Sequence, residues 1–337
     1  MAFNSKLLSV LEGAKPPTPP IWLMRQAGRY MPEYRAVREK VSFLELCKSP
    51  ELACEVTLQP VELLGVDAAI LFSDILVPIE PMGAGLDFNP APVIKNPVRD
   101  LAGAERLKTL SPLSDLPFLF NSIRLLKARL EVPLIGFCGA PFTLACYLTE
   151  GRGSKDFLEI KKLMYSNTHA YRLLMEKLTD SMIRYLQTQI DAGADAVQIF
   201  DTWAGVLSPS DYGEFVVPYL RRLTNNLKGA PVIYFAKAGA GHFRHMKGLS
   251  VKCIGVDWTT DLELADELLE RRYPLQGNLD PAVLLSDPAN LIKAADAVID
   301  AGRKLEHGHI FNLGHGILPS TPTENVKALI RHVQWRE

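Results

Sequence analysis

The sequence predicts an α/β protein built as a single (β/α)8 TIM barrel, with its active-site cleft at the C-terminal ends of the strands. Eight short runs rich in β-branched and aromatic residues alternate with longer helical patterns. These runs are continuously apolar, as expected for parallel strands that are buried on both faces. Dividing 337 residues among eight units gives about 42 residues each. A doubly wound open sheet is the alternative, because a sequence alone does not show whether a sheet closes.

The expected strands follow one another along the whole chain. They cover residues 20–24, 68–73, 133–138, 196–200, 231–236, 253–258, 274–279 and 309–314. Two stretches rich in proline and glycine, 81–97 and 150–155, leave room for excursions over the barrel mouth. The chain has no composition break or low-complexity linker, so we expect residues 1–337 to form one domain.

Proline-containing signals mark the starts of three helices. The Ser-Pro pair at 49–50 predicts an N-cap followed by proline in the first helical position. The Asp-Pro pair at 287–288 opens a helical pattern that is expected to end at Gly302, a glycine suited to the position after a helix. The Thr-Pro-Thr-Glu sequence at 321–324 predicts a capping box for the last helix.

Composition and charge exclude several classes of protein. The chain has 37 Lys and Arg residues against 38 Asp and Glu residues, a formal charge of −1. It is therefore not a general polyanion binder, and we expect neither nucleic acid nor membrane as a partner. The N-terminus lacks the apolar region of a secretory signal, and five scattered cysteines form no C-x-x-C motif. These features predict a cytoplasmic protein.

Polar residues follow four of the expected strands, where the chemistry of a barrel is found. These residues are Arg25, Asp74, the pair Asp201 and Thr202, and His315. Because the carboxyl ends of all strands meet on one face of a closed barrel, we expect these side chains to converge.

The most distinctive stretch is Met-Arg-Gln-Ala-Gly-Arg-Tyr at 24–30. Arg25 and Arg29 bracket a glycine immediately after a strand, and their guanidinium groups match carboxylates bidentately. A turn at Gly28 can aim backbone N–H groups at an anion. For the cations at 35–40 we favour a solvated basic helix start, but the position after a buried strand favours a ligand site for the two arginines.

Three further candidates each have a structural and a functional interpretation. Asp74 lies in apolar sequence and is either a helix cap or paired buried acid, or an acceptor for ligand N–H groups and a counter-charge to a cation. Tyr147 is expected early in a helix, either in the core or with its hydroxyl toward a ligand carboxylate. His315 stands between two glycines and either caps a loop or binds ligand. Asp257, Trp258 and Asn278 are expected to support these residues.

Several familiar motifs are missing. The Ala-Gly-Ala-Gly-His sequence at 238–242 lacks the third glycine of a dinucleotide fingerprint. The His-Phe-Arg-His sequence at 242–245 has no cysteine partner or H-E-x-x-H context, so we expect no metal. A P-loop and a G-x-S-x-G serine elbow are also missing.

Seven sequence blocks, in order, resemble the uroporphyrinogen decarboxylase family. They are WLMRQAGRYMPEYR, ILFSDIL, GFCGAPFTLACYLTEG, QIFDTWAG, GVDWTT, QGNLDP and FNLGHGI. The resemblance covers residues 3–330. The nearest competing family is the cobamide-dependent methyltransferases, which are similar in fold but would need a thiol-rich zinc site. No H-x-C with a later cysteine is present.

The resemblance implies a cytoplasmic carboxy-lyase of tetrapyrrole (haem or chlorophyll) biosynthesis, usually a homodimer. The implied reaction removes CO2 from the four acetate side chains of uroporphyrinogen III, gives coproporphyrinogen III and uses no cofactor. A non-catalytic tetrapyrrole carrier remains an alternative at this point.

The resemblance also implies roles for individual residues. The expected catalytic residues are Asp74, Arg25 and Arg29. The expected substrate-binding residues are Arg25, Gln26, Ala27, Gly28, Arg29, Asp74, Tyr147, Thr202 and His315. The family varies between Ser and Thr at Thr202, and the Phe-Ala-Lys-Ala-Gly sequence at 235–239 departs slightly from the family's F-x-K-G form, which leaves the role of Lys237 open. His315 is expected to titrate in the range of acid–base catalysis, although we favour carboxylate binding for it.

Overall fold

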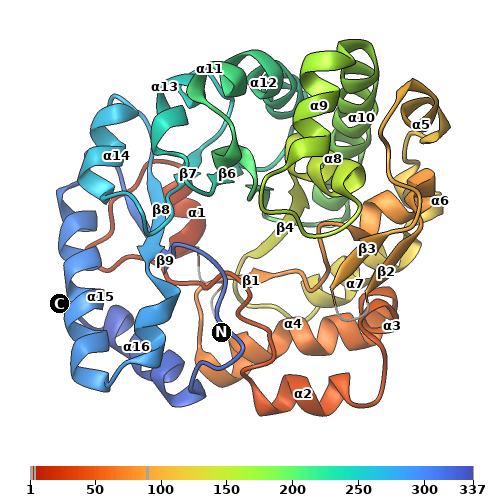
Figure 1. The fold of residues 1–337 in the computed structure, drawn as a ribbon. Coiled ribbons are helices and arrows are strands. Elements are labelled where there is room, and N and C mark those ends of the chain that lie inside the picture. Colours follow the sequence, from red (N-terminus) through yellow and green to blue (C-terminus); the bar gives the residue numbers. More distant parts are fainter. Residues whose placement is uncertain (1–2, 4, 89–90, 337) are drawn as a thin grey trace.

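Seven parallel strands form one curved sheet in a computed structural model that describes residues 3, 5–88 and 91–336. Their order is β1–β4–β5–β6–β7–β8–β9. The bounds are β1 (Ala69–Ile70), β4 (Leu134–Gly139), β5 (Ala196–Asp201), β6 (Val232–Ala236), β7 (Cys253–Gly255), β8 (Leu275–Leu279) and β9 (His309–Leu313). The strands lie at the centre of the molecule and the longer helices surround them (Figure 1). Seven of the predicted strands are confirmed by these elements.

The remaining predicted strand, 20–24, lies between the two edges of the sheet. On one side Ile21 forms a parallel bridge with Phe311 of β9, and the Phe311 N–H donates to the Pro20 carbonyl at 2.9 Å. On the other side the Ile21 carbonyl accepts the N–H of Asp67, just before β1, at 2.8 Å. The segment therefore joins both edge strands. The fold is TIM-barrel-like, and the open-sheet alternative is wrong.

The second predicted strand is shorter than expected. After Leu71, whose N–H still donates to β4, the chain leaves the sheet, and the Phe72 N–H donates to the Thr57 hydroxyl at 2.9 Å. Thr57 belongs to α4 (Pro50–Leu64), which packs beside this strand. The carboxyl end of β1 is thus free to carry a loop instead of a longer strand.

Helices cover the outside of the sheet. Those longer than six residues are α2 (Pro32–Arg38), α4, α7 (Pro117–Lys127), α8 (Pro141–Glu150), α9 (Leu158–Ser166), α10 (Thr168–Ala192), α12 (Val217–Asn225), α14 (Leu262–Leu268), α15 (Pro288–Lys304) and α16 (Thr323–Trp335). The shorter ones are α1 (Lys6–Leu11), α3 (Phe43–Lys48), α5 (Leu101–Arg106), α6 (Pro112–Asp115), α11 (Pro209–Asp211) and α13 (Phe243–Met246). Single turns of 3-10 or π geometry cover Val77–Ile79, Glu80–Ala84, Ala204–Val206, Tyr212–Val216, Ala240–His242 and Pro281–Leu285.

Two of the three predicted helix starts are confirmed. The Ser49 side chain accepts the Leu52 N–H at 3.4 Å at the start of α4, and the Asp287 side chain accepts the Asn290 N–H at 3.0 Å at the start of α15. The predicted end of α15 at Gly302 is wrong, because the helix continues to Lys304.

Gly302 is instead a packing residue. A β-carbon at this position would lie 2.2 Å from Nδ1 of His309 in β9, so only glycine lets the helix approach the sheet. The predicted capping box at 321–324 is also wrong. The last helix, α16, begins at Thr323 without a side-chain cap, and the Thr323 hydroxyl donates to the Tyr30 carbonyl at 3.1 Å.

The stretch 81–97 is partly folded into a two-stranded antiparallel sheet, β2 (Leu86–Phe88) and β3 (Pro92–Ile94). Its end is tied to α8, since the Ile94 N–H donates to the Gly151 carbonyl at 2.7 Å. The five cysteines are all free and buried, which confirms that they form no disulfide framework. Among the described residues no helix is long and apolar enough to cross a membrane.

Candidate active site

The backbone turns sharply at Arg25, immediately after the barrel segment 20–24. Arg25 has φ 63°, the left-handed region that side chains other than glycine rarely adopt. The turn is held on both sides, because the Met24 N–H donates to Oδ1 of Asn312 at 2.9 Å and the Ile317 N–H donates to the Met24 carbonyl at 3.0 Å. Such held strain is typical of functional sites. Sequence reasoning put the special turn at Gly28 and missed this position.

Gln26 faces the protein interior. Its side chain is 1% exposed, accepts the Leu23 N–H at 3.1 Å and donates to the Ala68 carbonyl at 3.1 Å. The backbone N–H of Gln26 donates to the Leu23 carbonyl at 2.9 Å. In the described part of the chain, no hydrogen bond involves the backbone N–H groups of the next three residues, 27–29. These three donors are therefore the part of the loop that can meet an anion.

The Arg25 side chain runs along Gly316, in the loop after β9. A β-carbon on Gly316 would lie 2.4 Å from Cδ and 3.0 Å from Nε of Arg25. The glycine after His315 therefore leaves the space through which the guanidinium reaches. In the sequence, Gly316 was the only sign of this contact, and it did not indicate Arg25 as the partner.

Asp74 follows β1 and uses only one of its carboxylate oxygens within the protein. Oδ1 accepts the Leu76 N–H at 2.9 Å within the loop, but Asp74 is not a helix cap, because the turn Val77–Ile79 has no side-chain cap. Among the described residues no hydrogen bond reaches Oδ2. Burial raises the pKa of the Asp74 carboxyl, while the Leu76 N–H and the Arg25 charge oppose that shift. The carboxylate can thus cap its loop and still accept ligand donors.

Tyr147 lies in the second half of α8, not early in the helix as predicted. Its ring packs against Trp203 with ring centroids 5.9 Å apart, and Phe157 covers the other side of Trp203 at 4.9 Å. Burial raises the pKa of the Tyr147 hydroxyl, the Asp74 charge raises it further, and Trp203 and Arg25 lower it. The hydroxyl is thus within the electrostatic reach of both Asp74 and Arg25.

His315 lies at the carboxyl end of β9, with its ring centroid 6.2 Å from those of Phe235 and Trp258. Burial lowers the pKa of His315 to about 4, and the charges of Arg25 and Lys237 add to the shift. The imidazole is therefore neutral at physiological pH. The expectation that it titrates in the range of acid–base catalysis is wrong, because two cations face it in a partly buried place.

Thr202 follows β5 directly, and no hydrogen bond of its side chain is found among the described residues. The loop that carries it is held from below by Asp201, which is fully buried. The Asp201 carboxylate accepts the Thr143 hydroxyl at 2.7 Å and the Tyr234 hydroxyl at 2.8 Å. Thr143 in turn accepts the Trp203 N–H at 3.1 Å. Burial raises the pKa of Asp201 to about 6, although the hydrogen bonds from these two hydroxyls lower it.

One charge links four of the predicted residues. The guanidinium of Arg25 acts on the pKa values of Asp74, Tyr147 and His315, and we name these four side chains the Arg25 cluster. Arg29 is exposed, and its charge acts on Tyr34 outside this cluster. Its backbone is fixed by a residue that the sequence suggested was only solvated, since the Arg35 guanidinium donates to the Arg29 carbonyl at 2.9 Å.

Asp257 and Asn278 support the loops around the site, as expected. Oδ1 of Asp257 accepts the Thr259 N–H at 2.9 Å, and its other oxygen accepts the Ala238 N–H. The Asn278 amide donates to the carbonyls of Asp257 and Thr260 at 2.9 and 2.6 Å. Trp258 joins them through its contact with His315.

Known proteins match this chain over its whole length. The model of the uroporphyrinogen decarboxylase (URO-D) family matches residues 2–335. The uroporphyrinogen decarboxylase of Pelobacter propionicus is 52% identical over 335 residues, 98% of each chain. That of Syntrophotalea carbinolica is 54% identical over 318 residues, 92% of each chain.

The chain belongs to the uroporphyrinogen decarboxylase family. It is a carboxy-lyase, a decarboxylase of porphyrin and haem biosynthesis. A solved methyltransferase from Methanosarcina mazei has a TM-score of 0.82 and covers 99% of this chain and 98% of its own, but it is 22% identical. That likeness shows a shared fold alone, so the competing methyltransferase interpretation gains no functional support from it.

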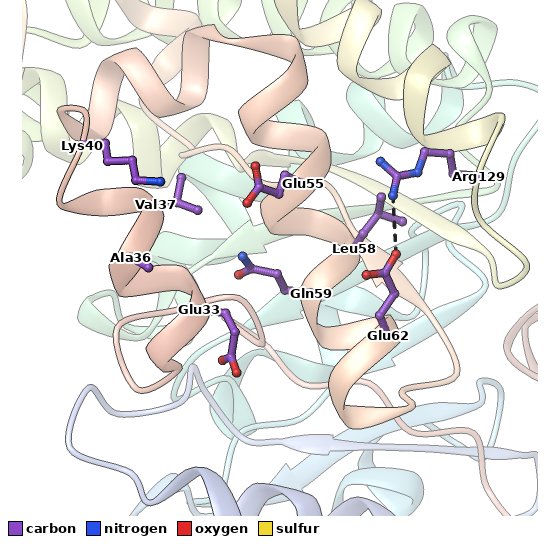
Figure 2. Close-up of a pocket in the computed structure, with 9 residues that line it drawn as sticks. All are labelled: Glu33, Ala36, Val37, Lys40, Glu55, Leu58, Gln59, Glu62 and Arg129. Atoms are coloured by element: carbon purple, nitrogen blue, oxygen red, sulfur yellow. Dashed lines mark ion pairs between the residues drawn. The ribbon is translucent and has the colours of Figure 1, made fainter.

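A surface hollow of about 410 Å3 lies away from the Arg25 cluster of this family member, between α2 and α4. Figure 2 shows charged side chains around it, including Glu33 and Glu55, and an ion pair of 3.6 Å between Arg129 and Glu62. None of the predicted site residues lines it. Among residues 3, 5–88 and 91–336, no group of three or more His, Cys, Asp and Glu side chains is placed to hold a metal ion.

Proposed function

We propose that this enzyme removes CO2 from the four acetate side chains of uroporphyrinogen III, releases coproporphyrinogen III and needs no cofactor. The observation that carries the proposal is the Arg25 cluster, in which the charge of one guanidinium acts on side chains that follow three other barrel elements. Among the described residues Arg25 has no ion-pair partner. A guanidinium left without a carboxylate suits a substrate that carries eight of them.

We assign Asp74 the role of acceptor for the pyrrole N–H groups at the centre of the substrate. Support comes from its second oxygen, Oδ2, which has no partner in the described part of the protein, while Oδ1 holds the loop through Leu76. Loss of CO2 from an acetate leaves an electron pair on the methylene carbon, so the reaction needs an electron sink. A pyrrole protonated on carbon provides that sink. An ionised Asp74 beside it stabilises the positive charge without reorganisation.

The proposed reaction balances without a further reactant. Each turn consumes one acetate carboxylate and one proton and yields one CO2 and one methyl group, and the proton placed on the pyrrole is returned when the ring recovers its neutral form. Arginine is not deprotonated in proteins, and His315, with its pKa lowered to about 4, is a neutral imidazole at pH 7 and therefore a poor acid. We therefore propose that Arg25 and Arg29 position acetates and that water delivers the proton.

We assign the remaining expected residues to substrate binding. The backbone from Gln26 to Arg29, with three donors that have no partner among the described residues, is proposed to bind a substrate carboxylate. The Tyr147 and Thr202 hydroxyls and the neutral His315 imidazole are proposed to complete the pocket. The inward side chain of Gln26 limits its own part to shaping the loop.

We also propose that residues 1–337 act as one domain, that two chains form a homodimer and that the enzyme works in the cytoplasm. Family resemblance supports these proposals, and the hydrogen bonds that join both sheet edges support the single domain. The molar mass in solution from light scattering tests the dimer.

The experiment that tests the proposed function measures CO2 release from enzymatically generated uroporphyrinogen under anaerobic conditions. The variant Asp74→Asn should keep its circular dichroism spectrum and lose about 10²–10³-fold in kcat, as expected for removal of an electrostatic stabiliser. Asp261→Asn removes one charge at an exposed position and is the matched control. Near-normal turnover by the Asp74 variant would refute this role, and binding without CO2 release by the unmodified enzyme would indicate a carrier.

A further inference from the structure

A third cation, Lys237, stands on the opposite side of the barrel mouth from Arg25. It follows β6 directly. Counting around the ring, β6 is four steps from the segment 20–24 in either direction, through β1, β4 and β5 or through β9, β8 and β7. The two cations therefore follow diametrically opposed positions of one barrel.

The Lys237 ammonium group faces the inside of the mouth. Its Nζ lies 5.4 Å from the centre of the Trp258 ring, which itself packs edge-on against His315. The charge of Lys237 also contributes to the lowered pKa of His315. Lys237 and Arg25 thus approach the same histidine from different sides.

No carboxylate compensates the Lys237 charge within the described part of the chain. Asp257, which also faces His315, is occupied by the Thr259 backbone and hydroxyl through one oxygen and by the Ala238 N–H through the other. Lys237 is half-buried, and its ammonium group lies over the Trp258 ring. A cation withdrawn from water without a counter-charge is costly, and an incoming anion removes that cost.

The backbone that presents Lys237 is fixed. Its N–H donates to the Asp201 carbonyl at 3.3 Å, and Ala238 next to it is in the left-handed region with φ 54°. The loop after β5 closes against it so tightly that a β-carbon on Gly205 would lie 2.7 Å from the Lys237 carbonyl. The backbone from which the lysine side chain starts is therefore held in place.

We propose that Lys237 binds a side-chain carboxylate of the substrate on the side of the barrel mouth opposite Arg25. This inference rests on the proposed function, because uroporphyrinogen carries carboxylates around its whole ring. Guanidinium groups at one edge can hold only one side of such a ligand. A cation at the opposite edge fixes the ring across the mouth, with the central N–H groups over Asp74.

The test compares Lys237→Gln and Lys237→Arg with the unmodified enzyme in the anaerobic CO2 assay. We expect Lys237→Gln to raise KM for uroporphyrinogen about tenfold with kcat changed less than twofold, since the lost interaction is a charge-assisted hydrogen bond. Lys237→Arg should restore most of the affinity. Lys252→Gln, at an exposed position before β7 on the opposite end of the barrel, is the matched control and should leave KM unchanged.

Two outcomes would overturn the inference. An unchanged KM in Lys237→Gln would show that the ammonium does not meet the substrate. A fall in melting temperature and in kcat without a rise in KM would indicate that the residue only holds Trp258. Both results require an unmodified enzyme that releases CO2. If the unmodified enzyme releases none, the proposed function has failed, and equilibrium binding of uroporphyrinogen to the same variants then decides the role of Lys237 by the same comparison.

Discussion

Replacing Asp201 by asparagine should change how the stability of this protein depends on pH. Asp201 is fully buried beneath the loop that carries Thr202, and burial raises its pKa from the ordinary value of 3.8 to about 6. The folded protein therefore holds this proton more tightly than the unfolded chain does. The resulting stabilisation is fully present below pH 3.8 and is lost as the pH rises through 6.

The size of the effect follows from the shift. About two pKa units at 1.36 kcal/mol per unit correspond to about 3 kcal/mol of unfolding free energy. About half of this falls between pH 5 and pH 8, where most other carboxylates no longer titrate. Asparagine has no proton to lose, and its amide can still bond Tyr234 and Thr143. The variant should therefore gain about 1–2 kcal/mol relative to the unmodified protein between pH 5 and pH 8.

Urea unfolding at several pH values between 5 and 8, followed by tryptophan fluorescence, measures this difference. The quantity of interest is the unfolding free energy of Asp201→Asn minus that of the unmodified protein at each pH. Asp261→Asn, at an exposed position at the start of α14, controls for the loss of one negative charge. A difference that stays constant with pH would show that buried Asp201 ionises as an ordinary aspartate, and the reasoning would then be refuted.

Three further predictions concern the Arg25 loop and its neighbours. Arg29→Lys should lower kcat/KM about tenfold because the planar guanidinium fork is lost, whereas the exposed control Arg331→Lys should not change it. If Arg29→Lys is as active as the unmodified enzyme at low substrate concentration, bidentate binding is contradicted. His315→Ala should raise KM more than it lowers kcat, and His315→Gln, which keeps a neutral N–H donor, should recover affinity. Because the pKa of His315 is lowered to about 4, neither variant should alter the pH profile of activity between pH 6 and pH 8. Gly316→Ala should keep the fold but lower kcat/KM at least about tenfold, because the new methyl group would lie 2.4 Å from Cδ of Arg25 and displace that side chain. The control Gly153→Ala, at a glycine with open space around it, should have no effect.

The sequence predicted the barrel because each buried parallel strand is a continuous apolar run that local composition reveals. The predictions from the sequence were wrong where contacts between residues distant in the chain determine the local structure. The segment 20–24 is a barrel element only through its bonds to β9 and Asp67 on either side. Gly302 lies inside its helix, and only glycine fits there because His309 leaves no space for a side chain. Pattern rules describe neighbours in sequence, and neither of these contacts is between such neighbours.

The candidate site was predicted in composition but not in arrangement. The charge of Arg25 acts on Asp74, Tyr147 and His315, and the roles of these residues toward the substrate stay a prediction. Arg29 is exposed, and its charge also acts on Tyr34. A pKa depends on burial and on charges that come from other strands, so no sequence pattern could reveal that His315 stays neutral.

By itself the sequence determined the family, the strand order and the chemical types at each strand end, because these follow from local patterns and motifs. Only the tertiary structure decided which of those groups face one another. It gave Arg25 a left-handed backbone and a path past Gly316, and it set Lys237 across the mouth without a carboxylate partner among the described residues. The physical reason is that electrostatic energy depends on distance and burial, and both are fixed only when the barrel closes.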